Sequence, residues 1–111
     1  DLWISNWAED GVQMPPDLPP LVGVEEITAG NQPDFVSGAD FVMDIYRIDE
    51  VNIMHGGKWG LTRCSYNFYI NTPDGPFWVV VDGKALTVFK KIRGEWKIAY
   101  ECFNSNLPVG P

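Results

Sequence analysis

The sequence of 111 residues is 45% hydrophobic and 14% aromatic, a composition typical of one globular domain with a buried core. Fifteen acidic residues against eight basic ones give a formal net charge of −7. This charge argues against nucleic acid or an anionic membrane as a partner, because both attract basic surfaces. No apolar run approaches the roughly 20 residues that cross a bilayer, and no signal peptide is recognisable. We therefore expect a cytoplasmic protein.

The N-terminal third predicts two short helices and one short strand. Apolar residues in the segment 1–8 recur at spacings of three and four, as in the last turns of an amphipathic helix that ends before Gly11. Residues 12–14 can form a strand, and the proline-rich segment 15–20 must be a loop. Residues 23–27 begin a second helix with acidic residues in its first turn. The segment 35–38 is irregular or adds one further helical turn.

The rest of the sequence predicts a four-strand antiparallel meander, because β-branched and aromatic runs alternate with turn residues. The predicted strands are 41–54, 59–70, 77–92 and 96–105, and the predicted turns are 55–58, 71–76 and 93–95. The first strand should bulge near Asp49 and Glu50. The third strand either kinks at Gly83 or divides there into a small hairpin. The fold class is therefore α+β, with helices packed on one face of a curved sheet.

Alternation along the last strand predicts which side chains face the core. One set is mostly large and apolar and ends in a polar group: Trp96, Ile98, Tyr100, Cys102 and Asn104. The other set, which includes Glu101 and Phe103, should face outward. In the second long strand, the even positions from Gly60 to Ile70 form the matching inner face. An inner face that is apolar along its length and polar at one end is typical of a small-molecule pocket.

Small residues on the inner face should leave space for a ligand, since bulky side chains would fill it. The predicted pocket residues are Met14, Leu18, Thr62, Cys64, Tyr66, Phe68, Ile98, Tyr100, Cys102 and Asn104. A compact, mostly apolar molecule would bind there, with its polar end at Tyr100 and Asn104. Two other interpretations stay open, since Tyr100 could simply pack in the core and Asn104 could close a turn.

Three segments carry a resemblance to a known family. They are 7–16 (WAEDGVQMPP) with 23–27 (GVEEI), then 60–66 (GLTRCSY), and the ending from 94–98 (GEWKI) through 103–108 (FNSNLP). Together they resemble the SnoaL-like branch of the nuclear transport factor 2-like superfamily, which includes ketosteroid isomerase and polyketide cyclases. The resemblance spans nearly the whole chain and implies a single cone-shaped α+β domain over residues 1–111. The family usually begins with one more long helix, so the first helix here is expected to be truncated.

The resemblance also bears on catalysis. The ketosteroid isomerase branch places its general base just after the first short strand, where this sequence has Pro15, and its oxyanion acid near residues 85–88, which contain no carboxylate. We therefore do not expect ketosteroid isomerase activity. SnoaL-like cyclases tend to have an acid at the position of Glu101, although alternation points this side chain outward unless a bulge intervenes. Glu101 and Tyr100 are the remaining catalytic candidates.

Metal and cofactor chemistry has little support in the sequence. His55 is the only histidine, it lies in a glycine turn, and no acid stands near it at ligand spacing. Cys102 has no histidine nearby in sequence that could activate it as a nucleophile. We expect no cofactor and no metal. Two functions remain: binding of an apolar small molecule, or an enzyme of the cyclase, isomerase or hydratase type that uses acid–base chemistry. A pocket carboxylate with a raised pKa would favour the enzyme.

The outer face of the sheet predicts a homodimer. Trp59, Leu61 and Tyr69 alternate onto it from one strand, and Phe103 is expected on it from the last strand. A contiguous apolar surface of this kind is a typical protein–protein contact. We expect two subunits to pack through this face, as in the family that the sequence resembles.

Overall fold

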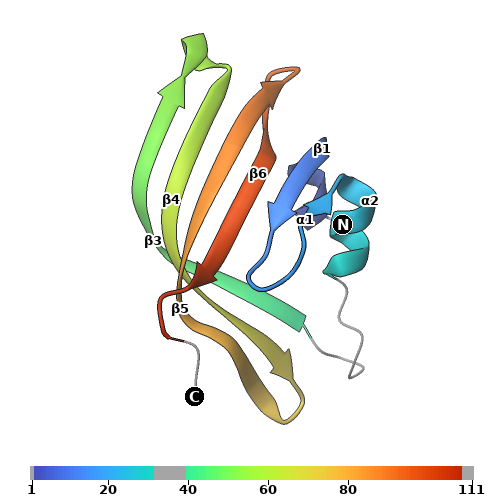
Figure 1. The fold of residues 1–111 in the computed structure, drawn as a ribbon, viewed down its shortest axis with the longest axis vertical. Coiled ribbons are helices and arrows are strands. Elements are labelled where there is room, and N and C mark those ends of the chain that lie inside the picture. The colour runs from blue at the N-terminus through green and yellow to red at the C-terminus, as the bar shows by residue number, and fades with distance from the viewer. Residues whose placement is uncertain (1, 32–39, 109–111) are drawn as a thin grey trace.

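The computed structural model describes residues 2–31 and 40–108. The elements are α1 (Leu2–Ser5), β1 (Trp7–Met14), β2 (Leu21–Val22), α2 (Val24–Gly30), β3 (Asp40–Met54), η1 (His55–Gly57), β4 (Trp59–Thr72), β5 (Gly75–Ile92) and β6 (Glu95–Ser105). The strands form one sheet of order β2-β1-β6-β5-β4-β3 (Figure 1). Its neighbouring strands are antiparallel except β1 and β6, which are parallel. This arrangement confirms the predicted α+β class. No helix in the described ranges is long and apolar enough to cross a membrane.

The meander from β3 to β6 follows the predicted strand order, because each strand is followed by residues that favour a tight turn. Ile92 pairs with Glu95 across the last turn. Its two central residues, Arg93 and Gly94, have φ values of 52° and 81°, which is the backbone that a two-residue hairpin turn requires. β5 continues through Gly83 as one long strand. The kinked-strand alternative is therefore the correct one.

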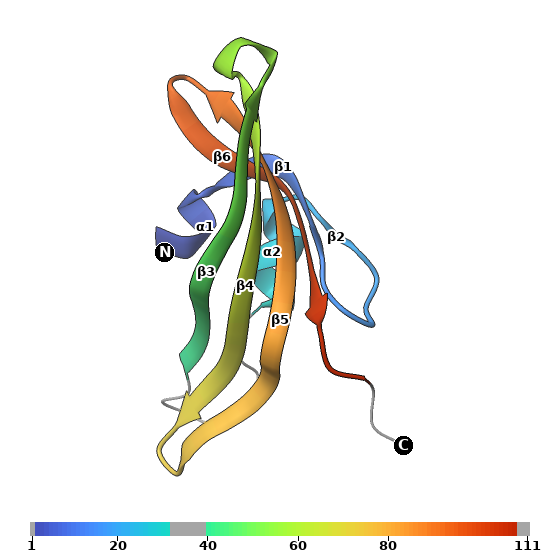
Figure 2. The same ribbon diagram turned by 90° about the vertical axis from the view of Figure 1, so that its left-hand side faces the viewer.

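The long strands bend where the pairing register shifts. β3 and β4 shift register between Ile45 and Arg47 and again between Ile48 and Glu50, which confirms the predicted bulge near Asp49 and Glu50. Bulges increase local twist and bend a strand. Figures 1 and 2 show the result, since the lower ends of β3, β4 and β5 turn away from the direction of their upper parts.

The N-terminal helix and the strand at 12–14 both form, but the boundary between them was predicted wrongly. The helix α1 stops at Ser5, and the strand β1 already begins at Trp7 and runs to Met14. Trp7 pairs with Ile98 of β6, and the backbone N–H of Ile98 donates to the carbonyl of Asn6 at 2.7 Å. Trp7 and Ala8 are both buried. Tertiary pairing with a distant strand has therefore overridden a helical pattern of local sequence.

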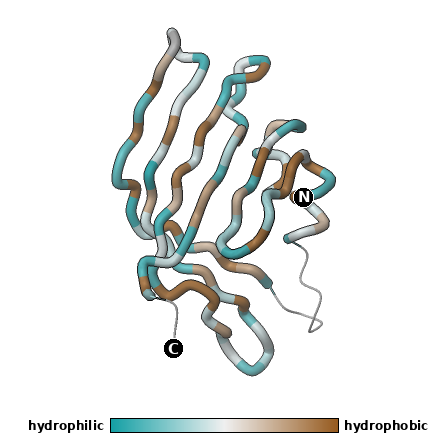
Figure 3. The backbone as a smooth tube through the Cα atoms, in the orientation of Figure 1, coloured by the Kyte–Doolittle hydropathy of each residue, from teal (hydrophilic) through white to brown (hydrophobic). Residues whose placement is uncertain are grey.

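The second helix forms as predicted, over Val24–Gly30. It buries Ile27 completely and lies with α1 beside β1 at one side of the sheet (Figure 1). A separate buried cluster of Tyr66, Val80 and Phe103 joins β4, β5 and β6. Brown and pale segments alternate along the long strands in Figure 3, as expected for strands with one apolar face. The predicted irregular segment 35–38 lies outside the described residues.

A bulge in β6 reverses the predicted faces of the last strand. Phe89 pairs with Ile98, but Val88 pairs with Tyr100, so Ala99 has no residue opposite it. One extra residue in a strand moves every following side chain to the other face. Beyond Ala99, the paired rows across the sheet are Thr62–Thr87–Glu101 and Cys64–Ala85–Phe103.

The corrected faces change the list of inner residues. Glu101 and Phe103 share the inner face with Cys64, and Phe103 is buried. Tyr100 and Cys102 pair with Val88 and Leu86 on the outer face, and Asn104 pairs with Lys84 there. The predictions that Tyr100, Cys102 and Asn104 face the core, and that Phe103 faces outward, were therefore wrong.

Candidate ligand pocket

A pocket of about 430 Å³ lies between the proline-rich loop, the end of α2 and the inner face of β4, β5 and β6. Its wall is formed by Gln13, Pro15, Pro16, Leu18, Pro19, Pro20, Leu21, Gly30, Asn31, Phe41, Phe68, Val79, Val80 and Phe103. Only Gln13 and Asn31 in this set carry polar side chains. A mostly apolar cavity with a few placed polar groups is the usual composition of a small-molecule site.

The two polar wall residues belong to one hydrogen-bonded chain. The Asn31 side-chain amide donates to the carbonyl oxygen of Ile27 at 2.7 Å and to Oε1 of Gln13 at 2.7 Å. Nε2 of Gln13 donates in turn to Oε1 of Glu101 at 3.2 Å. The chain forms because Gln13 pairs with Glu101 across β1 and β6, while Asn31 follows the last residue of α2. Gln13 is 3% exposed.

Glu101 is a half-buried residue behind this wall. Burial raises its pKa above the ordinary glutamate value, and the hydrogen bond from Gln13 opposes that rise. Tyr66 is 0% exposed, and its hydroxyl has no partner among the described residues. Desolvation raises the pKa of Tyr66, and the nearby charge of Glu101 raises it further. Glu101 does not itself contribute to the pocket wall, because Gln13 occupies that place.

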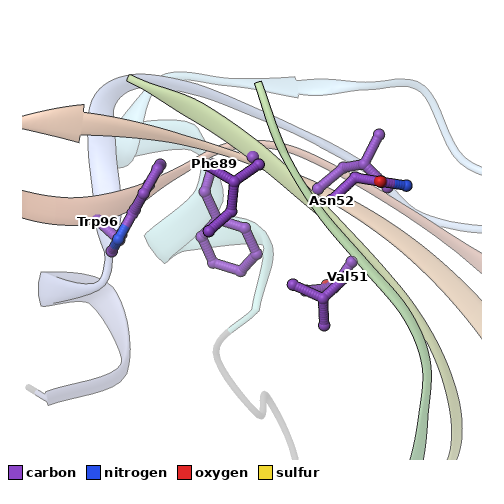
Figure 4. Close-up of a pocket in the computed structure, with 8 residues that line it drawn as sticks. Val51, Asn52, Phe89 and Trp96 are labelled. Atoms are coloured by element: carbon purple, nitrogen blue, oxygen red, sulfur yellow. The ribbon is translucent and has the colours of Figure 1, made fainter. Parts of the chain in front are cut away.

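A second cavity, of about 270 Å³, lies at the other end of the inner face. Figure 4 shows Val51 and Asn52 of β3 on one side of it and Phe89 and Trp96 of the last hairpin on the other. Gly60 and Thr62 also line it. This cavity lacks the amide chain of the larger pocket.

The predicted pocket residues are distributed over several places. Leu18 and Phe68 line the larger pocket, and Thr62 lines the smaller one. Cys64, Tyr66 and Ile98 share the inner-face rows but line neither cavity. Met14 pairs with Cys102, which places both on the outer face with Tyr100 and Asn104. Whether any of these residues contacts a ligand stays a prediction.

Sequence reasoning missed Gln13, Asn31, Val80 and Phe103 as pocket residues. Gln13 could have been found from the sequence. It lies in a strand-like segment between Gly11 and the prolines, and a buried amide in a strand must find a hydrogen-bond partner. Asn31 could not have been found, because its role depends on the distance between the end of α2 and β1. Within the described ranges, no group of three His, Cys, Asp or Glu residues could hold a metal ion.

Comparison with known proteins identifies the fold. No protein-family model matches the sequence, and no curated protein matches it. Among solved structures, a ketosteroid isomerase-like protein from Erwinia carotovora atroseptica is 19% identical with a TM-score of 0.61, over 95% of this chain and 79% of the other. A nuclear transport factor 2-like protein with a cystatin-like fold from Novosphingobium aromaticivorans is 14% identical with a TM-score of 0.70, over 92% and 66%.

A third structure has the same shape. An uncharacterized protein with a cystatin-like fold from Caulobacter vibrioides is 16% identical with a TM-score of 0.71, over 94% of this chain and 73% of the other. At such low identity the likeness concerns the fold and not the activity. The chain therefore has the curved α+β cone fold of the nuclear transport factor 2-like and ketosteroid isomerase-like proteins, as the sequence resemblance implied.

Proposed function

We propose that the protein binds a compact, mostly apolar small molecule in the 430 Å³ pocket. The observation that carries this proposal is the pocket wall, whose described residues are apolar except for the amides of Gln13 and Asn31. A cavity of this size is within the usual range for small ligands, roughly 300–1,000 Å³. The driving force would be the transfer of apolar ligand surface out of water, at about 25 cal/mol per Å² before the costs of association.

Two valines of β5 provide a test with a matched control. Val79 lines the pocket and is 50% exposed, whereas Val81 does not line it and is 59% exposed. Both positions should accept a glutamate without unfolding the protein, because both already face water in part. Binding of the neutral apolar dye N-phenyl-1-naphthylamine would be followed by its fluorescence.

Val79→Glu should weaken dye binding by about tenfold or more, because a carboxylate at the wall must lose water when the dye enters. Val81→Glu should bind the dye as the parent protein does. Circular dichroism would verify that both variants are folded. Equal affinity in the two variants, or no dye binding by the parent, would contradict the proposal.

A second candidate function is acid–base catalysis of the cyclase, isomerase or hydratase type. The observation that favours it is the half-buried carboxyl of Glu101, whose pKa is raised by desolvation and whose charge acts on Tyr66, a residue with no partner for its hydroxyl in the described part of the chain. Ketosteroid isomerase chemistry is not proposed, because Pro15 follows β1 directly and lines the pocket at the place where that chemistry needs a base. Glu101→Gln would remove turnover in an enzyme and leave dye affinity unchanged.

We also propose that the protein forms a homodimer through the outer face of the sheet. The corrected register puts Tyr100, Val88 and Leu61 in one outer row and Leu86 in the next. Leu86 and Tyr100 are 45% and 46% exposed. These residues replace Phe103 in the predicted contact and lie on the same face as Trp59 and Tyr69. A cytoplasmic location remains the expectation from the sequence.

A further inference from the structure

One backbone carbonyl sets the direction of the hydrogen-bonded chain at the pocket wall. The carbonyl oxygen of Ile27 can only accept, so the atom of Asn31 that faces it at 2.7 Å must be the amide nitrogen. The same nitrogen reaches Gln13 at 2.7 Å, so the atom of Gln13 at that contact must be its oxygen. The NH₂ group of Gln13 is thereby directed toward Glu101.

Among the described residues, only one of the two hydrogens on Nε2 of Gln13 has an acceptor. An amide nitrogen carries two hydrogens, and the one acceptor is Oε1 of Glu101. Gln13 is 3% exposed, so little of its surface is open to bulk water. A buried donor without a partner is unfavourable, and the space that Gln13 borders is the pocket.

We infer that the ligand of this pocket carries an uncharged oxygen acceptor, such as a carbonyl, ester or ether oxygen, which accepts the second N–H of Gln13. This inference rests on the proposed ligand-binding function and adds the chemical class of the ligand. The remainder of the ligand is apolar and packs against Phe41, Phe68 and Phe103, which line the same cavity. Asn31 is a positioning residue, since it holds the amide of Gln13 in the orientation that offers a donor.

The charges around the pocket disfavour an anionic ligand. The carboxyl of Glu101 lies 3.2 Å from Nε2 of Gln13, so a second carboxylate on the same amide would lie close to it. Among the described residues, no lysine or arginine lines the cavity, and the protein carries a formal net charge of −7. An anion would lose its water without gaining a counter-charge, which is strongly unfavourable in an apolar site.

Three matched probes test the inference by displacement of N-phenyl-1-naphthylamine. 2-Acetylnaphthalene carries a carbonyl acceptor, 2-isopropenylnaphthalene has the same shape without an acceptor, and 2-naphthoate is an anion. The measured quantity is the ratio of ketone affinity to hydrocarbon affinity, because this ratio cancels effects that both probes share. In the parent protein, 2-naphthoate should bind at least about tenfold more weakly than the ketone.

Two variants act on the donor in different ways. Gln13→Met removes the amide. Asn31→Asp removes the N–H group that donates to Oε1 of Gln13, so the amide of Gln13 should turn and donate to the new carboxylate. In both, the ketone-to-hydrocarbon ratio should fall about 3- to 10-fold, the range expected for one lost hydrogen bond. Asn104→Asp makes the same chemical change on the outer face and should leave the ratio unchanged.

The outcomes separate this inference from the proposed function. If the hydrocarbon displaces the dye but the ratio is the same in parent and Gln13→Met, the protein binds apolar ligands and the acceptor inference is wrong. Tightest binding of 2-naphthoate by the parent would also overturn it, and that measurement does not depend on the folding of any variant. If the parent binds neither dye nor probes, the proposed function itself fails and the inference fails with it.

Discussion

Replacement of Gly83 by alanine tests the packing that positions Tyr66. A Cβ atom at Gly83 would lie 2.7 Å from Cε1 and Cζ of Tyr66 and 2.8 Å from Cγ1 of Val80. Carbon atoms normally approach to about 3.5–4.0 Å, and Tyr66 is completely buried, so its ring has little room to move. Overpacking of this kind costs about 1–3 kcal/mol. A chain of 111 residues has an unfolding entropy of about 0.23 kcal/mol/K, so a loss of 2 kcal/mol should lower Tm by about 9 °C.

Calorimetry or circular dichroism would measure this change in a double-mutant cycle. Tyr66→Phe retains both clashing ring atoms, so the penalty of Gly83→Ala should persist in that background. Tyr66→Leu removes the ring and leaves only the 2.8 Å approach to Cγ1 of Val80, so part of the penalty should disappear. The reasoning would be refuted by an unchanged Tm for Gly83→Ala, or by an equal penalty in the phenylalanine and leucine backgrounds.

Two further predictions concern charge and assembly. The pKa of Glu101 is higher in the folded state than in the unfolded state. The folded protein is therefore more stable while Glu101 is protonated, and this stability is lost as the pH rises from the unfolded-state pKa through the folded-state pKa. Glu101→Gln should therefore have a higher Tm than the parent at pH values above this range, and the same Tm below it. A Tm difference that does not change with pH would contradict the idea that the ionised carboxylate destabilises the fold. In sedimentation experiments, Leu86→Lys on the outer face should convert the dimer to a monomer. Ile53→Lys, at an exposed site of the inner face, should leave the dimer intact. A parent protein that is monomeric at micromolar concentration would rule out the dimer.

The sequence predicted the meander because the determinants of its strands and turns are local. The turn at Arg93 and Gly94 and the bulge near Asp49 each follow from residues next to one another in the chain. The extent of the first helix was predicted wrongly for the opposite reason. Trp7 is spaced as in a helix, but its pairing partner Ile98 lies 91 positions away, and no local pattern reports that contact.

The candidate site was predicted less well than the fold, and one residue explains most of the error. Ala99 is an ordinary residue in a run that alternates cleanly, and nothing in the sequence marks it as the bulge. Its insertion exchanged the faces of Tyr100, Glu101, Cys102 and Phe103. The possibility that a bulge brings Glu101 inward was open from the sequence, but only the pairing of β5 with β6 decides it.

The position of Glu101 also bears on the choice between binding and catalysis. A general acid or base must come within hydrogen-bond reach of the proton it transfers, either directly or through one water. Here Gln13 stands between the pocket and Glu101, because its side chain borders the pocket and also donates to the carboxyl of Glu101. Catalysis would therefore require the side chain of Gln13 to move, and Asn31 holds that side chain at 2.7 Å. Binding requires no such movement, since the amide already borders the cavity with a donor to spare. The same carboxyl that first indicates an enzyme thus supports binding better, since it accepts one N–H of the amide that stands in front of it.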